Sequence, residues 1–319
     1  MNTWQRMNEY GKKKESFLFL IDYEKEKPLV WKLNQVPNYI KFQLPSYNSD
    51  VPQNEILPVP RLTALNFCKE KAKIDIHRAQ EFLKNGESYL LNLTYKIQLN
   101  NYDLNFRQLF NQSKSDYKFL WDDKFLSYSP ECFIRVNNDI ITTYPMKGTA
   151  KVQSGEKKSN LHKDSKEIAE HNTVVDLLRN DLNIISNNVL VKKYRFEKRI
   201  KTLNGDLIQT SSEISGQLDK DWSSKIGTII KSITPAGSIS GAPKRKTLQI
   251  IKSLENQQRG YYTGIFGLYH NDQLDTGILI RFIEKTNSDF FYRTGVGITI
   301  NSDSIQETEE LINKIYVPI

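Results

Sequence analysis

The 319-residue chain has few cysteines, no long apolar run and no apolar leader. Its two cysteines, Cys68 and Cys132, lie far apart and follow no pairing pattern, which excludes a disulfide framework and a thiolate metal site. No segment approaches the roughly 20 apolar residues that a membrane helix needs. Because the first residues, Met1 to Arg6, also lack an apolar signal core, we expect no membrane partner, no export and a cytoplasmic location.

Charge of one sign is not concentrated anywhere, although the chain is basic. It has 45 Lys and Arg against 37 Asp and Glu, for a net charge of +8. The lysines are dispersed and interleaved with acids, as in Asp22 to Lys27, whereas a nucleic-acid site usually gathers its charge on one face or helix. We therefore expect no nucleic-acid partner, and the excess charge fits anionic metabolites.

The residues that are present predict one large, interlocked α/β unit. Hydrophobic residues make up 38% of the chain, and strand-like and helix-like segments alternate without a repeat or a low-complexity linker. The patterns predict strands within 17–43, a loop from Tyr47 to Pro60, a helix from Lys71 to Lys84 and a strand from Tyr89, then short strands within 119–144 and helices at about 163–183 and 243–254.

The helix expected at 163–183 carries two glutamates on its apolar side. An advance of about 100° per residue places Glu167 and Glu170 in one arc with Val174, Leu177 and Leu178. An inward carboxylate is costly unless it is paired or bound to a cation, so the pair is a candidate site for a hard metal ion. The other interpretation is that both acids are solvated near the start of the helix, where the helix dipole favours them.

A second pair has the same spacing on the terminal helix. Glu307 and Glu310 lie on a stripe with Lys314, next to Leu311 and Ile315. If the two helices face each other, four carboxylates would surround one Mg²⁺ and leave positions open for water and an anionic ligand.

Three further features are candidate binding or catalytic groups. The segment from Pro235 to Lys244 is rich in glycine and serine and leads into a helix, so its amides form either an anion cradle or an ordinary helix entry. Arg281 interrupts an apolar strand, which indicates either a clamp for a carboxylate or a structural ion pair. Lys147 follows a strand and becomes a nucleophile only where its surroundings are apolar; otherwise it is one more surface lysine.

These features occur together and in one order, and from about Asp75 to the C-terminus the chain resembles the chorismate-utilising enzymes. The matching segments are Asn85 to Thr94, Ser129 to Glu131, Pro145 to Thr149, Ala169 to His171 with Val175 to Leu182, Gly237 to Lys244, Tyr262 to Gly264, Asp275-Thr276 with Arg281, and Glu307 to Lys314. The resemblance implies an α/β (α+β) fold of two stacked, mainly antiparallel β-sheets with helices outside. Residues 71–319 would form the chorismate-binding catalytic domain, and residues 1–70, which match weakly, a short segment packed on it.

The residue before Gly148-Thr149 separates two branches of this family. Anthranilate synthases have alanine there, whereas one group of aminodeoxychorismate synthases has the lysine found here as Lys147. The resemblance therefore implies the activity of aminodeoxychorismate synthase component I, which aminates chorismate at C4 on the route to 4-aminobenzoate and folate. A separate glutamine amidotransferase would supply the ammonia. Anthranilate synthase component I and, further off, isochorismate or salicylate synthase are the alternatives, and a non-catalytic binding subunit is the alternative of another class.

The resemblance also implies roles for individual residues. Lys147 would attack C2 of the ring, with Glu131 as general acid or base. Glu170 and Glu310 would hold Mg²⁺, with Glu167 and Glu307 in support. The residues implied to contact the substrate are Thr149, Gly237, Ser238, Ile239, Ser240, Gly241, Tyr262, Arg281, Gly297 and Lys314, of which Tyr262 and Arg281 would bind the enolpyruvyl carboxylate. The chain departs from the family pattern at Gln209, where many relatives have histidine.

Overall fold

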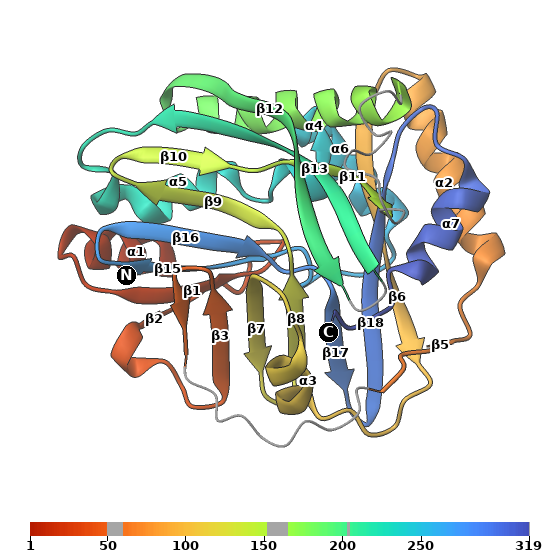
Figure 1. Ribbon diagram of the computed structural model, residues 1–319, viewed down its shortest axis with the longest axis horizontal. Helices are drawn as coiled ribbons and strands as arrows, with labels where there is room; N and C mark the ends of the chain where they lie inside the picture. Colours follow the sequence, from red (N-terminus) through yellow and green to blue (C-terminus); the bar gives the residue numbers. More distant parts are fainter. Residues whose placement is uncertain (50–59, 152–164, 203–204, 319) are drawn as a thin grey trace.

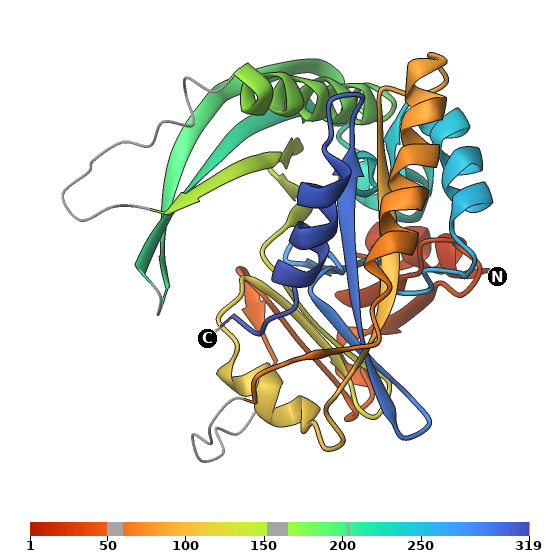
Figure 2. The same ribbon diagram turned by 90° about the vertical axis from the view of Figure 1, so that its right-hand side faces the viewer.

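The structure, a computed structural model, describes residues 1–49, 60–151, 165–202 and 205–318. At 147–151, 165–167, 198–202, 205–207 and 209 only the backbone is described. Two antiparallel sheets form the centre of the molecule, and helices lie on their outer faces (Figures 1 and 2). This arrangement confirms the expected fold class. In the described ranges, no helix is long and apolar enough to cross a membrane.

β1, the strand next to the edge strand β2, shows how the first sheet is buried. β1 (Phe17–Ile21) pairs with β15 on one side and β2 on the other, and all five of its residues are buried. Phe17 and Phe19 join the cluster under the helices, whereas Leu18 and Leu20 join the cluster between the sheets, because neighbouring side chains on a strand point to opposite faces. The strand order is β11 (Met146–Lys151), β13 (Gly205–Gln217), β10 (Ile140–Thr143), β9 (Cys132–Asn137), β16 (Gln273–Ile278), β15 (Ile265–His270), β1 and β2 (Leu29–Lys32), and β12 (Asn187–Thr202) pairs with β13.

The second sheet crosses the first, and its strands run vertically in Figure 1. Phe42 and Phe119 on its inner face share a buried cluster with Phe266 of β15 in the first sheet, so the two sheets share a core. The strand order is β14 (Gly241–Ala242), β6 (Leu90–Leu99), β18 (Asp289–Ile298), β17 (Phe282–Thr286), β8 (Phe125–Ser129), β7 (Tyr117–Trp121), β3 (Ile40–Leu44) and β4 (Tyr47–Asn48), and β5 (Ala64–Leu65) pairs with β6.

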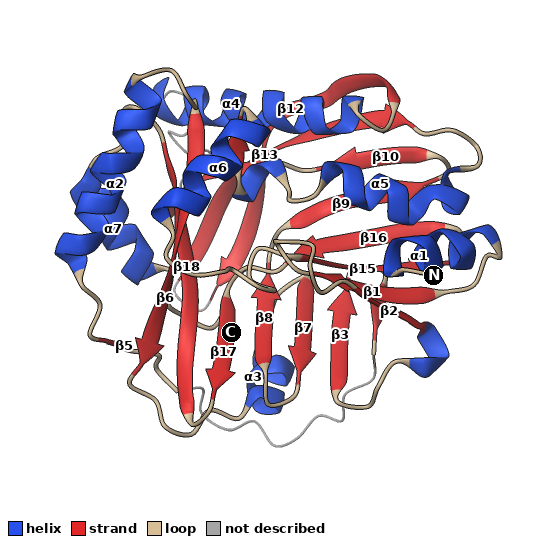
Figure 3. Ribbon diagram, turned by 180° about the vertical axis from the view of Figure 1, so that it is seen from behind, coloured by secondary structure: helices blue, strands red, loops and turns tan. Residues whose placement is uncertain are grey.

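The helices cover the outer faces of both sheets (Figure 3). Side chains of α1 (Thr3–Lys12), α4 (Ser165–Asn183) and α5 (Ile226–Ile233) share a buried cluster with the first sheet. Those of α2 (Lys69–Lys84), α6 (Lys244–Leu254) and α7 (Ser304–Asn313) share one with β6 and β18. α3 (Phe106–Gln112) packs on β7 and β8, and the short 3₁₀ helices are η1 (Leu33–Gln35), η3 (Trp222–Lys225) and η4 (Gly237–Ile239).

The sequence patterns located most elements correctly. α2 ends at Lys84 as predicted, because Gly86 takes the left-handed φ of +73° that helix ends favour in glycine. The loop predicted from Tyr47 begins instead with β4, and residues 50–59 lie outside the described residues. The first 70 residues supply strands to both sheets, so in this structure they share the core with residues 71–319.

Candidate active site

One cavity of about 480 Å³ gathers most of the side chains that the sequence singled out. It is bounded by β6 and β18 of the second sheet, by α4 and α7, and by the η4 loop. Ten of the residues expected at the site line it: Glu131, Glu170, Ser238, Ile239, Tyr262, Arg281, Gly297, Glu307, Glu310 and Lys314. Residues from seven segments of the chain therefore meet at one place.

Glu131 is held by the glycine-rich loop. It lies between β8 and β9, and its Oε1 accepts a 2.6 Å hydrogen bond from the hydroxyl of Ser238 in η4. Asn92 on β6 donates from its Nδ2 to the carbonyl of Ser238 at 3.1 Å, which fixes this loop against the sheet. A carboxylate on a cavity wall, oriented by a hydroxyl, has the geometry of a general acid or base.

The glycines of the loop serve its packing. The amide of Gly237 donates to Oδ2 of Asp181 at 3.1 Å, and a Cβ at Gly237 would lie 2.7 Å from the Leu177 side chain. Gly241 has a φ of +141°, and a Cβ there would lie 1.9 Å from the carbonyl oxygen of Leu90. Gly237, Gly241 and Ser240, whose hydroxyl donates to a backbone carbonyl, do not line the cavity, whereas Ser238 and Ile239 do. The loop therefore presents Ser238 to the cavity and keeps its own ends buried.

An ion pair joins the C-terminal end of the loop to α4. Lys244, at the start of α6, lies 2.6 Å from Asp181 of α4. Burial raises the pKa of the Asp181 carboxyl, and Lys244 opposes that rise.

Arg281 lies at a bend between β16 and β17, not within a strand as the sequence predicted. Its φ of +52° is in the left-handed region, which costs a non-glycine residue on the order of 1 kcal/mol. Its guanidinium lies 5.0 Å from the centre of the Tyr316 ring and forms no ion pair with a described side chain. The geometry favours the clamp for a carboxylate over the structural ion pair.

Tyr262 lines the cavity and is 4% exposed. Burial raises the pKa of its hydroxyl well above the usual value, and the neighbouring Arg259 lowers it less. The hydroxyl therefore stays protonated and can donate to an anionic group.

The acidic residues of two helices reach the same cavity. Glu170 comes from α4, and Glu307 and Glu310 come from α7. Lys314 lies 2.6 Å from Oε1 of Glu310 and donates to the carbonyl of Gly295 at 2.8 Å. The side chain of Glu167 lies outside the described residues.

Carboxylate oxygens are the donors that Mg²⁺ prefers, so the donor chemistry of this wall fits that ion. Across the described part of the chain, no three acidic, histidine or cysteine side chains are close enough together to form a metal site. α4 and α7 bring the glutamates of the two helices to one cavity. Lys314 is paired with one carboxylate oxygen of Glu310 there.

Lys147 and Thr149 lie on β11, next to Met146, which lines the cavity. β11 pairs with β13 so that Lys147 is opposite Thr210 and Thr149 is opposite Gln209, with an irregularity between the two pairs. The side chains of Lys147, Thr149 and Gln209 lie outside the described residues.

Five other polar residues that line the cavity were given no role from the sequence: Asn92, Thr94, Thr263, Arg293 and Thr294. Arg293 is 7% exposed, and its Nε lies 3.2 Å from Glu284. Arg293, Gly295 and Gly297 follow one another at two-residue intervals on β18, so they lie on the same face of the strand. The spacing of the two glycines was visible in the sequence and could have identified Arg293.

Comparison with known proteins identifies the family. Residues 11–319 match the family described as chorismate binding enzyme. The chain is 43% identical to a PabA-like protein of Haemophilus influenzae, covering 99% of this chain and 96% of that protein. It is 31% identical to anthranilate synthase component 1 of Aquifex aeolicus, covering 78% of this chain and 52% of the relative. The structure of anthranilate synthase component I from Streptococcus pneumoniae matches with a TM-score of 0.73 at 21% identity, over 99% of this chain and 85% of that one.

The chain therefore belongs to the chorismate-binding enzyme family, and it is an enzyme that acts on chorismate. The resemblance inferred from the sequence motifs is confirmed at this level, as is the fold it implied.

Proposed function

We propose that this protein is component I of an aminodeoxychorismate synthase, which replaces the 4-hydroxyl of chorismate with an amino group. The observation that carries the proposal is the identity of residue 147. It is a lysine in the segment Pro145 to Thr149, and its neighbour Met146 lines the cavity. The corresponding segment of anthranilate synthases has alanine, as the family resemblance implies, and an alanine side chain offers no nucleophile at this position.

The proposed reaction has two displacements. The neutral amine of Lys147 forms a bond to C2, the ring double bonds shift, and the 4-hydroxyl leaves as water after it takes a proton from Glu131. Ammonia then forms a bond to C4, the double bonds shift back, and the lysine leaves C2 as the free amine. The balance is chorismate and ammonia on one side and aminodeoxychorismate and water on the other.

The residues of the cavity supply orientation and charge. The hydrogen bond from Ser238 holds Glu131 in place for proton transfer. Arg281 and Tyr262 bind the enolpyruvyl carboxylate, since one is a cation and the other a neutral donor on the same wall. Gly297 and Lys314 line the same cavity and complete the pocket around the ring. Thr149, two residues after Lys147, would contact the substrate as the family resemblance implies.

We also propose that the protein binds Mg²⁺ at the acidic wall, where Glu170 and Glu310 would hold the ion and Glu307 would support them. Glu167, one turn before Glu170 in the sequence, would be the second supporting residue. Bound there, the ion would neutralise the ring carboxylate of chorismate and offset the repulsion among the glutamates.

Ammonia requires a source, and we propose a separate glutamine amidotransferase subunit as partner. A glutaminase of this kind uses a reactive thiolate. Cys132 is buried, and burial raises the pKa of its thiol to about 12. Cys68 lies at the start of α2, away from the residues that line the cavity.

Product analysis tests the proposal. Purified protein with chorismate, Mg²⁺ and ammonium should form aminodeoxychorismate, with the enolpyruvyl group retained in the product mass. Glutamine should replace ammonium only when an amidotransferase is added. Release of pyruvate with formation of anthranilate would assign the chain to the anthranilate synthase branch, and hydroxylated products would assign it to the isochorismate branch.

A further inference from the structure

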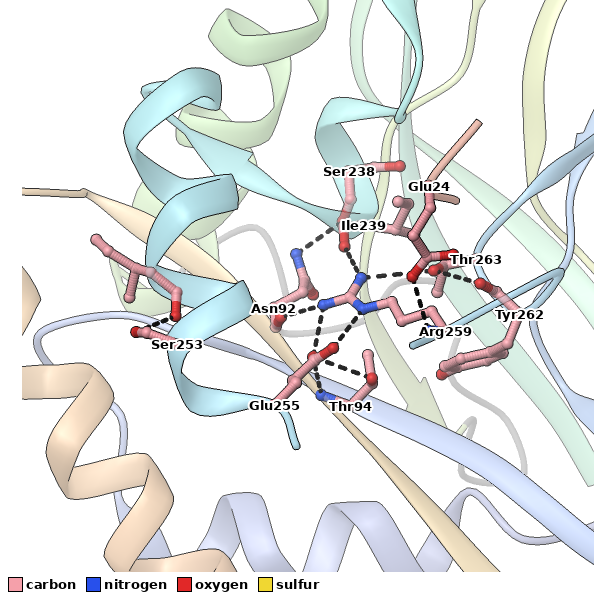
Figure 4. A network of polar contacts seen from close by, with 11 residues as sticks. Glu24, Asn92, Thr94, Ser238, Ile239, Ser253, Glu255, Arg259, Tyr262 and Thr263 are labelled. Carbon is pink, nitrogen blue, oxygen red and sulfur yellow. Dashed lines mark hydrogen bonds and ion pairs between the residues drawn. The ribbon is translucent and has the colours of Figure 1, made fainter. Parts of the chain in front are cut away.

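Arg259 is the largest fully buried side chain of the described residues. Figure 4 shows it bonded to Glu255, Asn92 and Ile239, and the last two residues line the cavity. Arg259 precedes the turn that carries Tyr262 and is 1% exposed. Its guanidinium forms a two-point contact with Glu255, from Nε to Oε2 at 2.9 Å and from Nη2 to Oε1 at 2.7 Å. The Tyr23 ring covers it at 4.3 Å. A buried arginine that is paired in this way holds one fixed orientation.

The remaining donors of Arg259 reach two other segments of the wall. Nη1 donates to the carbonyl of Ile239 at 2.9 Å, and Nη2 donates to the carbonyl of Asn92 at 2.7 Å. Ile239 follows Ser238, and Asn92 binds the carbonyl of Ser238. The guanidinium therefore holds Ile239, the chain neighbour of Ser238, and Asn92, which binds the Ser238 carbonyl. Both contacts fix the position of Ser238 beside Glu131.

Glu255 extends the contact along β6. Its Oε1 accepts from the amide of Thr94 at 2.9 Å and from the hydroxyl of Thr94 at 3.0 Å. Thr94 and Asn92 both line the cavity, so the ion pair grips β6 at two positions of the wall.

The turn after Arg259 connects the pair to the clamp residues. The amides of Arg259 and Gly260 donate to the carboxylate of Glu24, at 2.8 and 3.0 Å, which anchors the turn. The amide of Thr263 donates to the carbonyl of Leu279 at 2.8 Å, two residues before Arg281. Tyr262 and Arg281 are thus held by the same turn.

We propose that Arg259 and Glu255 form a positioning pair for chorismate turnover. The pair keeps the Ser238 hydroxyl within hydrogen-bond distance of Glu131, and it touches neither the substrate nor the cavity. Neither side chain lines the cavity, so the pair acts through the backbone of the η4 loop and β6. A guanidinium is required because an ammonium group cannot reach two carbonyls and both carboxylate oxygens in one plane. The inference rests on the family activity and holds whichever carbon of chorismate is aminated.

The test measures chorismate consumption with Mg²⁺ and ammonium, together with chorismate affinity in the absence of ammonium. Arg259→Lys keeps the charge and should lower kcat by about tenfold or more, with chorismate affinity changed by less than about threefold. Glu255→Gln keeps the size and should lower kcat in the same direction. If Arg259→Lys shows no cooperative unfolding transition and is therefore not folded, Glu255→Gln replaces it in the test.

A double-mutant cycle separates positioning from general destabilisation. Because the effect passes through Ser238, Arg259→Lys should reduce kcat much less in a Ser238→Ala background than in the parental protein. Lys118→Met is the matched control, since Lys118 is also a buried cation bound to backbone carbonyls but lies outside the cavity wall, and its kcat should stay parental. Parental kcat in Arg259→Lys, equal losses in both backgrounds, or equal losses of affinity and kcat would each overturn the proposal.

Discussion

The hydroxyl of Ser238 donates a 2.6 Å hydrogen bond to Oε1 of Glu131, which joins the glycine-rich loop to the segment between β8 and β9. Both residues line the cavity. A hydrogen bond of this length is at the short end of the usual range for a hydroxyl donor, and it holds the Glu131 carboxyl group in one orientation. The orientation of Glu131 therefore depends on one side chain from another part of the sequence.

Removal of that hydroxyl should affect turnover more than binding. Ser238→Ala should lower kcat by about 10- to 100-fold, because the Glu131 carboxyl group loses the hydrogen bond that orients it for proton transfer. Steady-state kinetics of chorismate consumption measure the effect. Ser232→Ala is the control, because that hydroxyl donates only to a backbone carbonyl on α5. If Ser238→Ala and Ser232→Ala have the same kcat, Ser238 does not orient the catalytic carboxylate.

Lys147 separates the two leading functions. Lys147→Ala should abolish formation of aminodeoxychorismate, because no neutral amine remains to attack C2, while chorismate still binds. A small amount of product aminated at C2 is expected, since ammonia can then reach that carbon. Mass analysis of products and a binding titration measure both effects, with Lys252→Ala, an exposed lysine of α6, as control. Parental amination at C4 in Lys147→Ala would exclude the covalent step.

The acidic wall predicts dependence on Mg²⁺. Excess chelator should stop turnover, and Glu170→Gln or Glu310→Gln should lower kcat/KM by at least about 100-fold, because each removes a charged donor. Calorimetric titration of Mg²⁺ in the presence of chorismate should show weaker binding in both variants. Glu309→Gln is the control, since Glu309 lies on α7 but outside the cavity and is exposed. Full activity in chelator, or unchanged Mg²⁺ binding, would contradict the assignment.

Lys118 predicts a pH dependence of stability. It is 6% exposed and donates to the carbonyls of Phe110 and Ser113, at 2.9 and 3.1 Å. Burial lowers the pKa of its ammonium group to about 8. Above that pH the folded protein releases a proton that the unfolded chain retains up to its higher pKa, so the free energy of unfolding rises with pH in this window.

The comparison with Lys118→Met isolates this effect, because other groups titrate alike in both proteins. The difference in unfolding free energy, parental minus Lys118→Met, should rise by about 1 to 2 kcal/mol between pH 7.5 and 9.5. Urea unfolding at the two pH values measures it. A difference that is constant or falls with pH would show that Lys118 is not held in a site that disfavours its charge.

Sequence motifs predicted the family and most of the elements, and ten of the residues predicted for the site line one cavity. Hydrophobic periodicity located α2 and α4, because a helix that packs on a sheet needs an apolar stripe. The residues of that stripe are three or four positions apart, so the sequence of the segment alone reveals it. The spacing of the glutamates placed Glu170 and Glu310 on cavity-facing helix sides for the same reason.

Only the tertiary structure decided which of these residues meet. The bend at Arg281 was not predictable, because the apolar residues on both sides of it have the pattern of one continuous strand. Arg259 was missed because a lone arginine followed by glycine carries no local signal of burial. Its partners Glu255, Asn92 and Ile239 come from a helix end, a strand and a loop that only packing brings together. Local periodicity is fixed by neighbours within a few residues, whereas a buried charge is stable only when distant segments supply its partners.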